Sequence, residues 1–209
     1  MNRFLAFALA SLTACATGEP TAEAGTDAAP ALEEGQAEAI FAGGCFWCME
    51  KDFEHVEGVL SVVSGYTGGK EEHPTYQQVG YHLTSHYEAV RVVYDPSVTS
   101  YETLLGLFWH SVDPTQADGQ FCDKGDQYRT GIFTSDPAER ALAEASKAKA
   151  QEALGQPIVT EILPAATFWV AEEYHQDFYL KNPVRYMSYR TGCGRDARLA
   201  ELWGESAGR

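Results

Sequence analysis

Basic residues are scarce in this sequence, and no long repeats occur in it. Its 209 residues include 15 Lys and Arg but 30 Asp and Glu, so the formal net charge is -15 at pH 7. An acidic surface repels nucleic acid and anionic lipid headgroups, so we expect neither as a partner of the folded part. With 44% hydrophobic and 22% charged residues, the composition excludes a disordered polymer and a polytopic membrane protein, and indicates a soluble globule. The length fits one domain with additional sequence at an end.

The N-terminus has the features of an export signal. Arg3 precedes an apolar run over residues 4–12, which is too short to span a bilayer but suits the apolar region of a signal peptide. The run leads into Leu12-Thr13-Ala14-Cys15, which resembles the lipobox of bacterial lipoproteins. That resemblance implies a lipoprotein signal peptide over residues 1–15, lipidation of Cys15, and a lipid-anchored protein of the bacterial cell envelope that faces the periplasm. An ordinary cleaved signal peptide with a chance cysteine is the alternative.

Residues 16–35 have the composition of a linker. They consist mainly of Ala, Glu, Thr, Gly and Pro, and Leu32 is their one sizeable apolar side chain. Such a segment cannot bury enough apolar surface to offset the entropy lost on ordering. We therefore predict a flexible acidic linker over residues 16–35 and a folded domain over residues 36–209, with a monomer as the default.

Short strands and helices interleave in the folded part. Apolar patterns predict strands over residues 38–42, 58–66, 87–94 and 158–163. They predict helices after Gly43-Gly44 through Phe53 and over residues 101–112, 138–154, 172–180 and 196–202. Ser100, either Ser135 or Asp136, and Gly155 are the expected helix caps. The early strands are close enough along the chain to pair antiparallel. We predict an α+β fold: a single two-layer domain with a central mixed, largely antiparallel sheet packed by helices, of the ferredoxin-like kind.

Cys45 and Cys48 form a C-x-x-C pair where the first strand meets the first helix. A sulfur at a helix start lies near unpaired N–H groups and the positive end of the helix dipole, which favour thiolate. We predict that Cys45 ionises easily and is the nucleophile, and that Cys48, one turn later, can close a disulfide with it. Zinc sites, haem attachment and structural disulfides also use C-x-x-C. However, Met49 stands where covalent haem needs His, and Cys122 and Cys193 are not paired as zinc ligands usually are.

Glu88 is the candidate acid. Strand alternation places it on one face with Val90 and Val92. Desolvation on that apolar face should raise the pKa of Glu88 and keep a proton on it near neutral pH, although a surface or salt-bridged Glu is the alternative. Phe46 and Trp47, between the two cysteines, would form an apolar wall for a methyl group or thioether, although such aromatics more often belong to a core.

Several longer motifs follow one another in the folded part. They are Gly43-Gly44-Cys45-Phe46-Trp47-Cys48-Met49-Glu50, Ser64-Gly65-Tyr66-Thr67-Gly68-Gly69, Pro74-Thr75-Tyr76, His86-Tyr87-Glu88, Asp113-Pro114-Thr115-Gln116, Gln127-Tyr128-Arg129 and Ala171-Glu172-Glu173-Tyr174-His175-Gln176. In this order they resemble the signature of the peptide methionine-S-sulfoxide reductases, the A type, in its GCFWC subtype. The resemblance covers about residues 39–204.

The resemblance implies a role for each matching residue. The implied roles are Cys45 as the nucleophile, Glu88 as the acid that protonates the sulfoxide oxygen, Phe46 and Trp47 as the cradle of the S-methyl group, Tyr76 and Tyr128 as hydrogen-bond donors to the oxygen, and Asp123 as a further polar group of the pocket. These roles suit the chemistry, because a sulfoxide sulfur is a poor electrophile until its oxygen is protonated or strongly hydrogen-bonded. A pocket tyrosine of some members falls here on Phe178, and its role is not carried over.

The implied reaction returns methionine-S-sulfoxide, free or in proteins, to methionine and leaves a sulfenic acid on Cys45. A second thiol then closes a disulfide, which a thioredoxin-like dithiol protein reduces; no metal or other cofactor is implied. The resemblance favours Cys48 as the resolving thiol, with Cys193 as the alternative, and we expect Cys122 to be an inert loop residue. The competing interpretations are a general thiol–disulfide oxidoreductase of the envelope and a lipoprotein that binds metal or peptide through the same cysteines.

Overall fold

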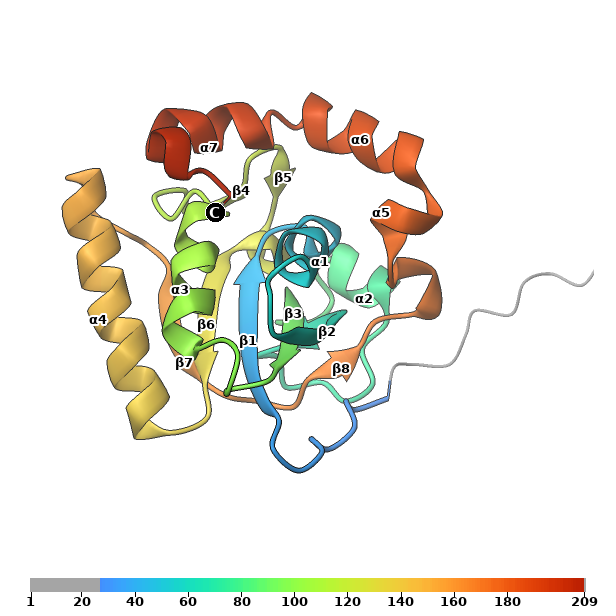
Figure 1. The fold of residues 1–209 in the computed structure, drawn as a ribbon. Helices are drawn as coiled ribbons and strands as arrows, with labels where there is room; N and C mark the ends of the chain where they lie inside the picture. The colour runs from blue at the N-terminus through green and yellow to red at the C-terminus, as the bar shows by residue number, and fades with distance from the viewer. Residues whose placement is uncertain (1–26, 209) are drawn as a thin grey trace, which may run out of the picture.

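The computed structural model describes residues 27–208 (Figure 1). The predicted signal peptide, Cys15 and the first part of the predicted linker lie outside the described residues. Within the described part of the chain, no helix combines the length and the apolar character that crossing a bilayer requires.

A six-stranded mixed sheet forms the centre of the fold, with the strand order β7-β6-β1-β3-β2-β8. Its strands are β1 (Ala37–Gly43), β2 (Val59–Thr67), β3 (Tyr87–Tyr94), β6 (Thr130–Thr134), β7 (Glu161–Pro164) and β8 (Trp169–Val170). β6 and β7 pair in parallel, and the other neighbouring strands pair antiparallel. A separate hairpin joins β4 (Gly119–Gln120) to β5 (Asp123–Lys124). The predicted α+β fold with one mixed, largely antiparallel sheet is confirmed.

Helices cover the sheet and one of its ends. They are α1 (Phe46–Glu54), α2 (Tyr76–Gly80), α3 (Tyr101–His110), α4 (Pro137–Leu154), α5 (Phe178–Lys181), α6 (Pro183–Gly192) and α7 (Arg195–Trp203), with 3-10 turns at Asp126–Tyr128, Glu173–His175 and Gly204–Ser206. Figure 1 shows α4 outside α3, and α6 and α7 across the end of the sheet where β1 runs into α1. That end is where the C-x-x-C pair lies.

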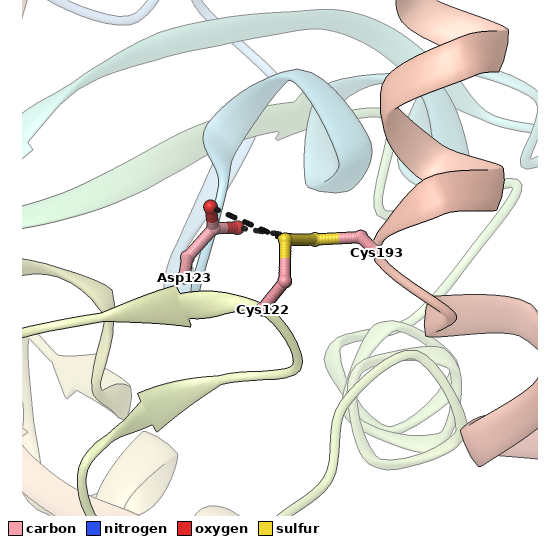
Figure 2. Close-up of side chains that lie close together, drawn as sticks. All are labelled: Cys122, Asp123 and Cys193. Atoms are coloured by element: carbon pink, nitrogen blue, oxygen red, sulfur yellow. Dashed lines mark hydrogen bonds between the residues drawn. A yellow bond between two sulfur atoms is a disulfide. The ribbon is translucent and has the colours of Figure 1, made fainter.

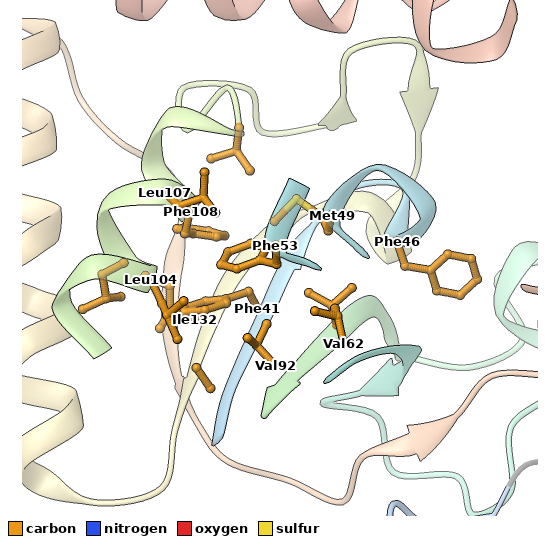
Figure 3. Close-up of a cluster of buried hydrophobic side chains, with 14 of the residues drawn as sticks. Phe41, Phe46, Met49, Phe53, Val62, Val92, Leu104, Leu107, Phe108 and Ile132 are labelled. Atoms are coloured by element: carbon orange, nitrogen blue, oxygen red, sulfur yellow. The ribbon is translucent and has the colours of Figure 1, made fainter. Parts of the chain in front are cut away.

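The main hydrophobic core lies between the sheet and the helices α1 and α3 (Figure 3). Phe41 of β1 stacks on Phe53 of α1 and on Phe108 of α3, with ring centroids 5.2 Å apart in both pairs. Strand alternation sends Val92 of β3 into the same core, whereas Ile40 faces a second cluster on the opposite side of the sheet. Buried aromatic side chains dominate the energetics of such cores. This packing therefore fixes α1 relative to β1 and β3.

The predicted helix caps are mostly confirmed. The Ser100 hydroxyl accepts a hydrogen bond from the Thr103 amide at 3.2 Å and begins α3. Asp136, rather than Ser135, begins α4, because its carboxylate accepts hydrogen bonds from the first amides of the helix. Gly155 ends α4 with φ +64°, a left-handed conformation that glycine adopts without steric penalty.

The prediction of one helix over residues 172–180 is wrong. The segment instead forms the 3-10 turn Glu173–His175 and then the short α5, and the two are separated by Asp177 with φ +53°. The cause is tertiary, because the Gln176 side chain hydrogen-bonds to both the amide and the carbonyl of Ser64 in β2. These bonds hold the segment against the sheet edge and prevent a continuous helix.

The start of the described chain extends the sheet edge. Ala28 forms an isolated antiparallel bridge with Trp169 of β8. The Ala29 amide donates to the Phe168 carbonyl at 2.9 Å, and the Val170 amide donates to the Asp27 carbonyl at 2.8 Å. Residues 27–29, within the segment predicted as a flexible linker, are thus paired with the edge of the sheet.

Candidate active site

Cys45 lies at the tip of α1, directly after the glycine pair that ends β1. Gly44 has φ +80°, and a Cβ atom there would lie 2.5 Å from Cβ of Gln120, so a side chain at this position would be strained by its backbone and blocked by its neighbour. The Cys45 carbonyl accepts hydrogen bonds from the amides of Cys48 and Met49. Cys45 is therefore the N-cap residue of α1, as its position in the sequence predicts.

The side chains predicted from the sequence for the substrate pocket come together around this tip. A cavity of about 60 Å³ is lined by Cys45, Phe46, Trp47, Tyr76, Glu88, Asp123, Tyr128 and Tyr189. Its residues come from α1, α2, β3, β5, the 3-10 turn before β6, and α6. Tyr189 is a pocket residue that none of the sequence motifs indicated. The only sequence signal for it is its position on the apolar face of α6, one turn after Tyr186 and one turn before Cys193.

Glu88 occupies the position predicted for an acid. It is 3% exposed, and one of its oxygens, Oε2, accepts a hydrogen bond from the Phe46 amide at 3.2 Å. Burial raises the pKa of Glu88 to about 8, the charges of Asp123 and Cys48 act in the same direction, and the Phe46 amide acts against them. The prediction that desolvation keeps Glu88 protonated near neutral pH is confirmed.

Phe46 and Trp47 form the apolar wall of the pocket. The Trp47 ring stacks on Phe178 with centroids 3.7 Å apart and planes 6° apart. The Trp47 indole N–H donates to Nδ1 of His175 at 3.1 Å, and burial lowers the pKa of His175 to about 4, so this histidine stays a neutral acceptor. Phe178 and His175 therefore fix the orientation of Trp47. His175 lies within one of the sequence motifs and Phe178 stands at the position of a pocket tyrosine of some family members, but neither signal predicts this role.

Phenol groups form the polar side of the pocket. Burial raises the pKa of Tyr76 to about 12 and raises the pKa of Tyr128 further, so both remain hydrogen-bond donors at neutral pH. The Tyr189 hydroxyl donates to Oδ2 of Asp123, and burial raises the pKa of the Asp123 carboxyl. The pocket thus offers several O–H donors opposite the Cys45 sulfur.

The prediction that Cys45 ionises easily is wrong for the resting state. Burial raises its pKa well above the ordinary thiol value, and hydrogen bonding with Cys48 adds to the rise. The partner thiol behaves in the opposite way: the hydrogen bond from Cys45 lowers the pKa of Cys48 to about 7, with further help from Arg195 and Arg190. Desolvation at the buried helix tip outweighs the helix dipole, so near neutral pH the pair holds its proton on Cys45.

Cys122 and Cys193 are joined by a disulfide (Figure 2). Cys122 lies in the β4–β5 hairpin and Cys193 follows α6, with Cα atoms 4.9 Å apart. The Asp123 carboxylate lies beside both sulfurs, 3.8 Å from that of Cys122 and 4.0 Å from that of Cys193. Cys122, predicted to be an inert loop residue, lies in a hairpin loop but is disulfide-bonded. Cys45 and Cys48 are the free cysteines of the described chain, and both are buried.

Comparisons with known proteins agree with this geometry. The family model of the peptide methionine sulfoxide reductases matches residues 37–207. The peptide methionine sulfoxide reductase MsrA 2 of Caulobacter vibrioides is 53% identical over 178 residues, which cover 84% of this chain and 90% of that protein. MsrA of Bacillus subtilis is 51% identical over 175 residues, covering 83% of this chain and 99% of the relative. The crystal structure of Saccharomyces cerevisiae Mxr1 in reduced form superposes with a TM-score of 0.68 at 33% identity, covering 71% of this chain and 86% of that one. The chain therefore belongs to the peptide methionine sulfoxide reductase family and is an oxidoreductase that reduces methionine sulfoxide.

Proposed function

We propose that Cys45 attacks the sulfur of methionine-S-sulfoxide while Glu88 protonates its oxygen. The observation that carries this assignment is that both groups line one small cavity, the thiol at the tip of α1 and the carboxyl on the β3 face beneath it. The raised pKa of Glu88, about 8, keeps the proton that a sulfoxide oxygen needs before its sulfur becomes electrophilic.

In the first step, the proton of Cys45 passes to Cys48. Cys48 can accept it because its lowered pKa leaves it ionised while Cys45 is protonated. The Cys45 sulfur then attacks the sulfoxide sulfur and forms an S–S bond while Glu88 gives its proton to the oxygen. The S–O bond to methionine breaks, the oxygen bonds to the Cys45 sulfur as sulfenic acid, and the S–S bond breaks. Methionine leaves as the thioether, reduced by two electrons, and Cys45 is oxidised by two. The hydroxyls of Tyr76 and Tyr128 stabilise the charge that develops on the oxygen.

Phe46 and Trp47 receive the S-methyl group. Phe46 is fully buried, and Trp47 is held in one orientation by Phe178 and His175. A rigid aromatic wall on one side and O–H donors on the other distinguish the methyl group of the sulfoxide from its oxygen. This asymmetry supports the preference for the S epimer that the family implies, in free methionine sulfoxide and in peptides alike.

Cys48 resolves the sulfenic acid in this proposal. It is the free thiol next to Cys45 along α1, whereas Cys193 is already bonded to Cys122. Attack of the Cys48 sulfur on the sulfenic sulfur forms the Cys45–Cys48 disulfide and releases the oxygen as water. This assignment corresponds to the GCFWC subtype that the active-site motif resembles.

A thioredoxin-like dithiol protein then reduces the enzyme in this proposal, without a metal or other cofactor. Yeast Mxr1, which resembles this chain in fold, is also known in complex with Trx2. The N-terminal sequence through Cys15 supports lipid anchoring to a membrane of the cell envelope, so the reductant would be a periplasmic protein. Substitution of Cys15 by Ala should release the protein from the membrane fraction if this anchor is used.

The decisive experiment compares the two epimers of N-acetyl-methionine sulfoxide as substrates of the purified full chain with dithiothreitol. We expect conversion of the S epimer by the wild-type protein, none of the R epimer, and no conversion by Cys45→Ser. The proposal would be contradicted if reduced protein failed to convert the S epimer while Cys45 remained titratable.

A further inference from the structure

Arg195 is a buried cation without a carboxylate partner. It is 1% exposed. Its Nη2 donates to the carbonyls of Gly43 at 3.2 Å and Ser111 at 2.7 Å and lies 3.1 Å from the Met49 sulfur. Its Nε has no hydrogen-bond partner within the described residues, and none of the ion pairs between them includes Arg195. A buried guanidinium surrounded by neutral acceptors is strongly unfavourable unless an anion lies nearby.

Arg190, the other buried arginine of this region, is balanced. Its guanidinium forms a double hydrogen bond with Asp52, at 2.9 and 3.2 Å, and another with Asp196 at 2.8 Å. The Tyr186 hydroxyl completes its surroundings. Two carboxylates therefore compensate the charge of Arg190, and the charge of Arg195 still requires an anion.

Two contacts of Arg195 are residues that flank the C-x-x-C pair in the sequence. Gly43 lies two residues before Cys45, and Met49 directly follows Cys48. Cys48 is buried and free, and the positive charge of Arg195 helps to lower the pKa of Cys48 to about 7, after the larger effect of the hydrogen bond from Cys45. On the other side, the Arg195 guanidinium stacks 4.6 Å over the ring of Phe121, next to the disulfide-bonded Cys122.

We propose, building on the proposed role of Cys48, that Arg195 is the buried counter-ion of the Cys48 thiolate and thereby a positioning residue for the resolving step. The thiolate supplies the electron pair of the new S–S bond when it attacks the Cys45 sulfenic sulfur. The S–O bond breaks, and the oxygen takes up the proton that Cys48 received from Cys45 in the first step and leaves as water. Burial of Cys48 away from water disfavours its thiolate. Arg195 offsets this effect and keeps Cys48 in the ionised form that the attack needs.

Other titratable groups also act on Cys48. Besides Arg195 from α7, they are Cys45 and Asp52 from α1, Glu88 from β3, and Tyr186, Tyr189 and Arg190 from α6. Asp52 raises the pKa of Cys48 and is itself paired with Arg190. Asp123 is the competing anion, since Arg195 also lowers the pKa of its carboxyl. The test must therefore separate Cys48 from Asp123.

The experiment measures the ionisation of Cys48 directly. In a full-length Cys15→Ser, Cys45→Ser background, with the Cys122–Cys193 disulfide intact, Cys48 is the remaining free thiol, and its thiolate absorbance near 240 nm can be followed against pH. We expect Arg195→Gln to raise the midpoint by about one pH unit or more, and Arg195→Lys to restore most of the shift. Arg140→Gln is the control, since this exposed residue of α4 pairs with Glu144 and should leave the midpoint unchanged.

An unchanged midpoint in folded Arg195→Gln protein would overturn the proposal. If Asp123 is the true counter-ion, Arg195→Gln leaves the midpoint where it was and Asp123→Asn destabilises the protein; that result also counts against the proposal. The thiolate absorbance and the protein stability are both measured without methionine sulfoxide. A failure of the proposed Arg195 role is therefore distinguishable from a failure of the proposed reaction.

A second measurement does not require an arginine variant to fold. A thiol whose pKa is lowered on folding stabilises the protein above its unfolded pKa, and this stability is lost as the pH falls through the folded pKa. In a shared Cys15→Ser, Cys45→Ser background, the unfolding free energy of the parent minus that of the Cys48→Ser variant should therefore grow as the pH rises from about 7 to about 9. A difference that stays flat over this range would mean that the folded protein does not stabilise the thiolate.

Discussion

The backbone amide of Phe46 donates a hydrogen bond to Oε2 of Glu88 at 3.2 Å. This bond joins the first turn of α1 to β3 and places the carboxyl directly beside the Cys45 tip. A protonated carboxyl can accept this bond through one oxygen and donate its proton from the other. The hydrogen bond therefore orients an acid without consuming the proton that the reaction needs.

Replacement of Glu88 by Gln should reduce kcat/KM for N-acetyl-methionine-S-sulfoxide by about a hundredfold or more. Gln keeps the shape of the side chain and can still accept the Phe46 hydrogen bond, but it carries no acidic proton. Glu144→Gln, on the exposed surface of α4, is the control and should retain full activity. Turnover of Glu88→Gln within about threefold of wild type would instead support a general thiol–disulfide oxidoreductase.

The pH profile of kcat/KM should be bell-shaped, with its maximum between about 7 and 8. Cys48 must be ionised, and its pKa is about 7; Glu88 must be protonated, and its pKa is about 8. The rate therefore rises as the pH passes the first value and falls as it passes the second. In Glu88→Gln, the residual rate should lose the alkaline fall. Stopped assays over roughly pH 5 to 10 test both limbs, and an alkaline fall that persists in the variant would assign it to another group.

The early strands, α3 and α4 could be predicted because their signals are local. The signals are the alternation of side chains along β3, the Ser100 cap of α3, and the Asp136 and Gly155 caps at the two ends of α4. Each depends on neighbours within a few residues. The segment over residues 172–180 could not be predicted, because Gln176 bonds to a strand more than a hundred residues earlier in the chain. No helical periodicity reports such a contact.

Among the site residues, Glu88 was the easiest to identify, because a lone carboxylate on an apolar strand face already implies a raised pKa. The protonation of Cys45 could not be predicted, because its cause is the burial of the helix tip against α5 and α6. The sequence shows only where the helix starts. The Cys122–Cys193 bond was equally inaccessible, because it depends on the β4–β5 hairpin meeting the end of α6. Tyr189 enters the pocket by the same packing.

Replacement of Cys48 by Ser should stop the enzyme after one half-reaction. About one methionine per protein should form, because Cys45 remains able to accept the oxygen, although more slowly without its thiolate base. The Cys45 sulfenic acid should then persist and react with dimedone, which adds a mass that peptide mapping locates. The wild-type protein, treated in the same way, should instead contain a Cys45–Cys48 disulfide. A sulfenic acid in Cys48→Ser that disappears as fast as in wild type would identify another resolving thiol.

The Cys122–Cys193 disulfide should stabilise the fold without being needed for the first turnover. It closes a loop with a sequence separation of 71 residues, for which chain entropy predicts a contribution of about 4 kcal/mol to the free energy of unfolding. Urea denaturation of the Cys122→Ser, Cys193→Ser double variant, without reductant, measures this loss against wild type. Cys15→Ser is the matched control, because it removes a cysteine and leaves the bond intact. Since Cys45 and Cys48 both remain in the double variant, one turnover should still end in their disulfide. If the variant stopped at the sulfenic acid instead, Cys193 rather than Cys48 would be the resolving cysteine.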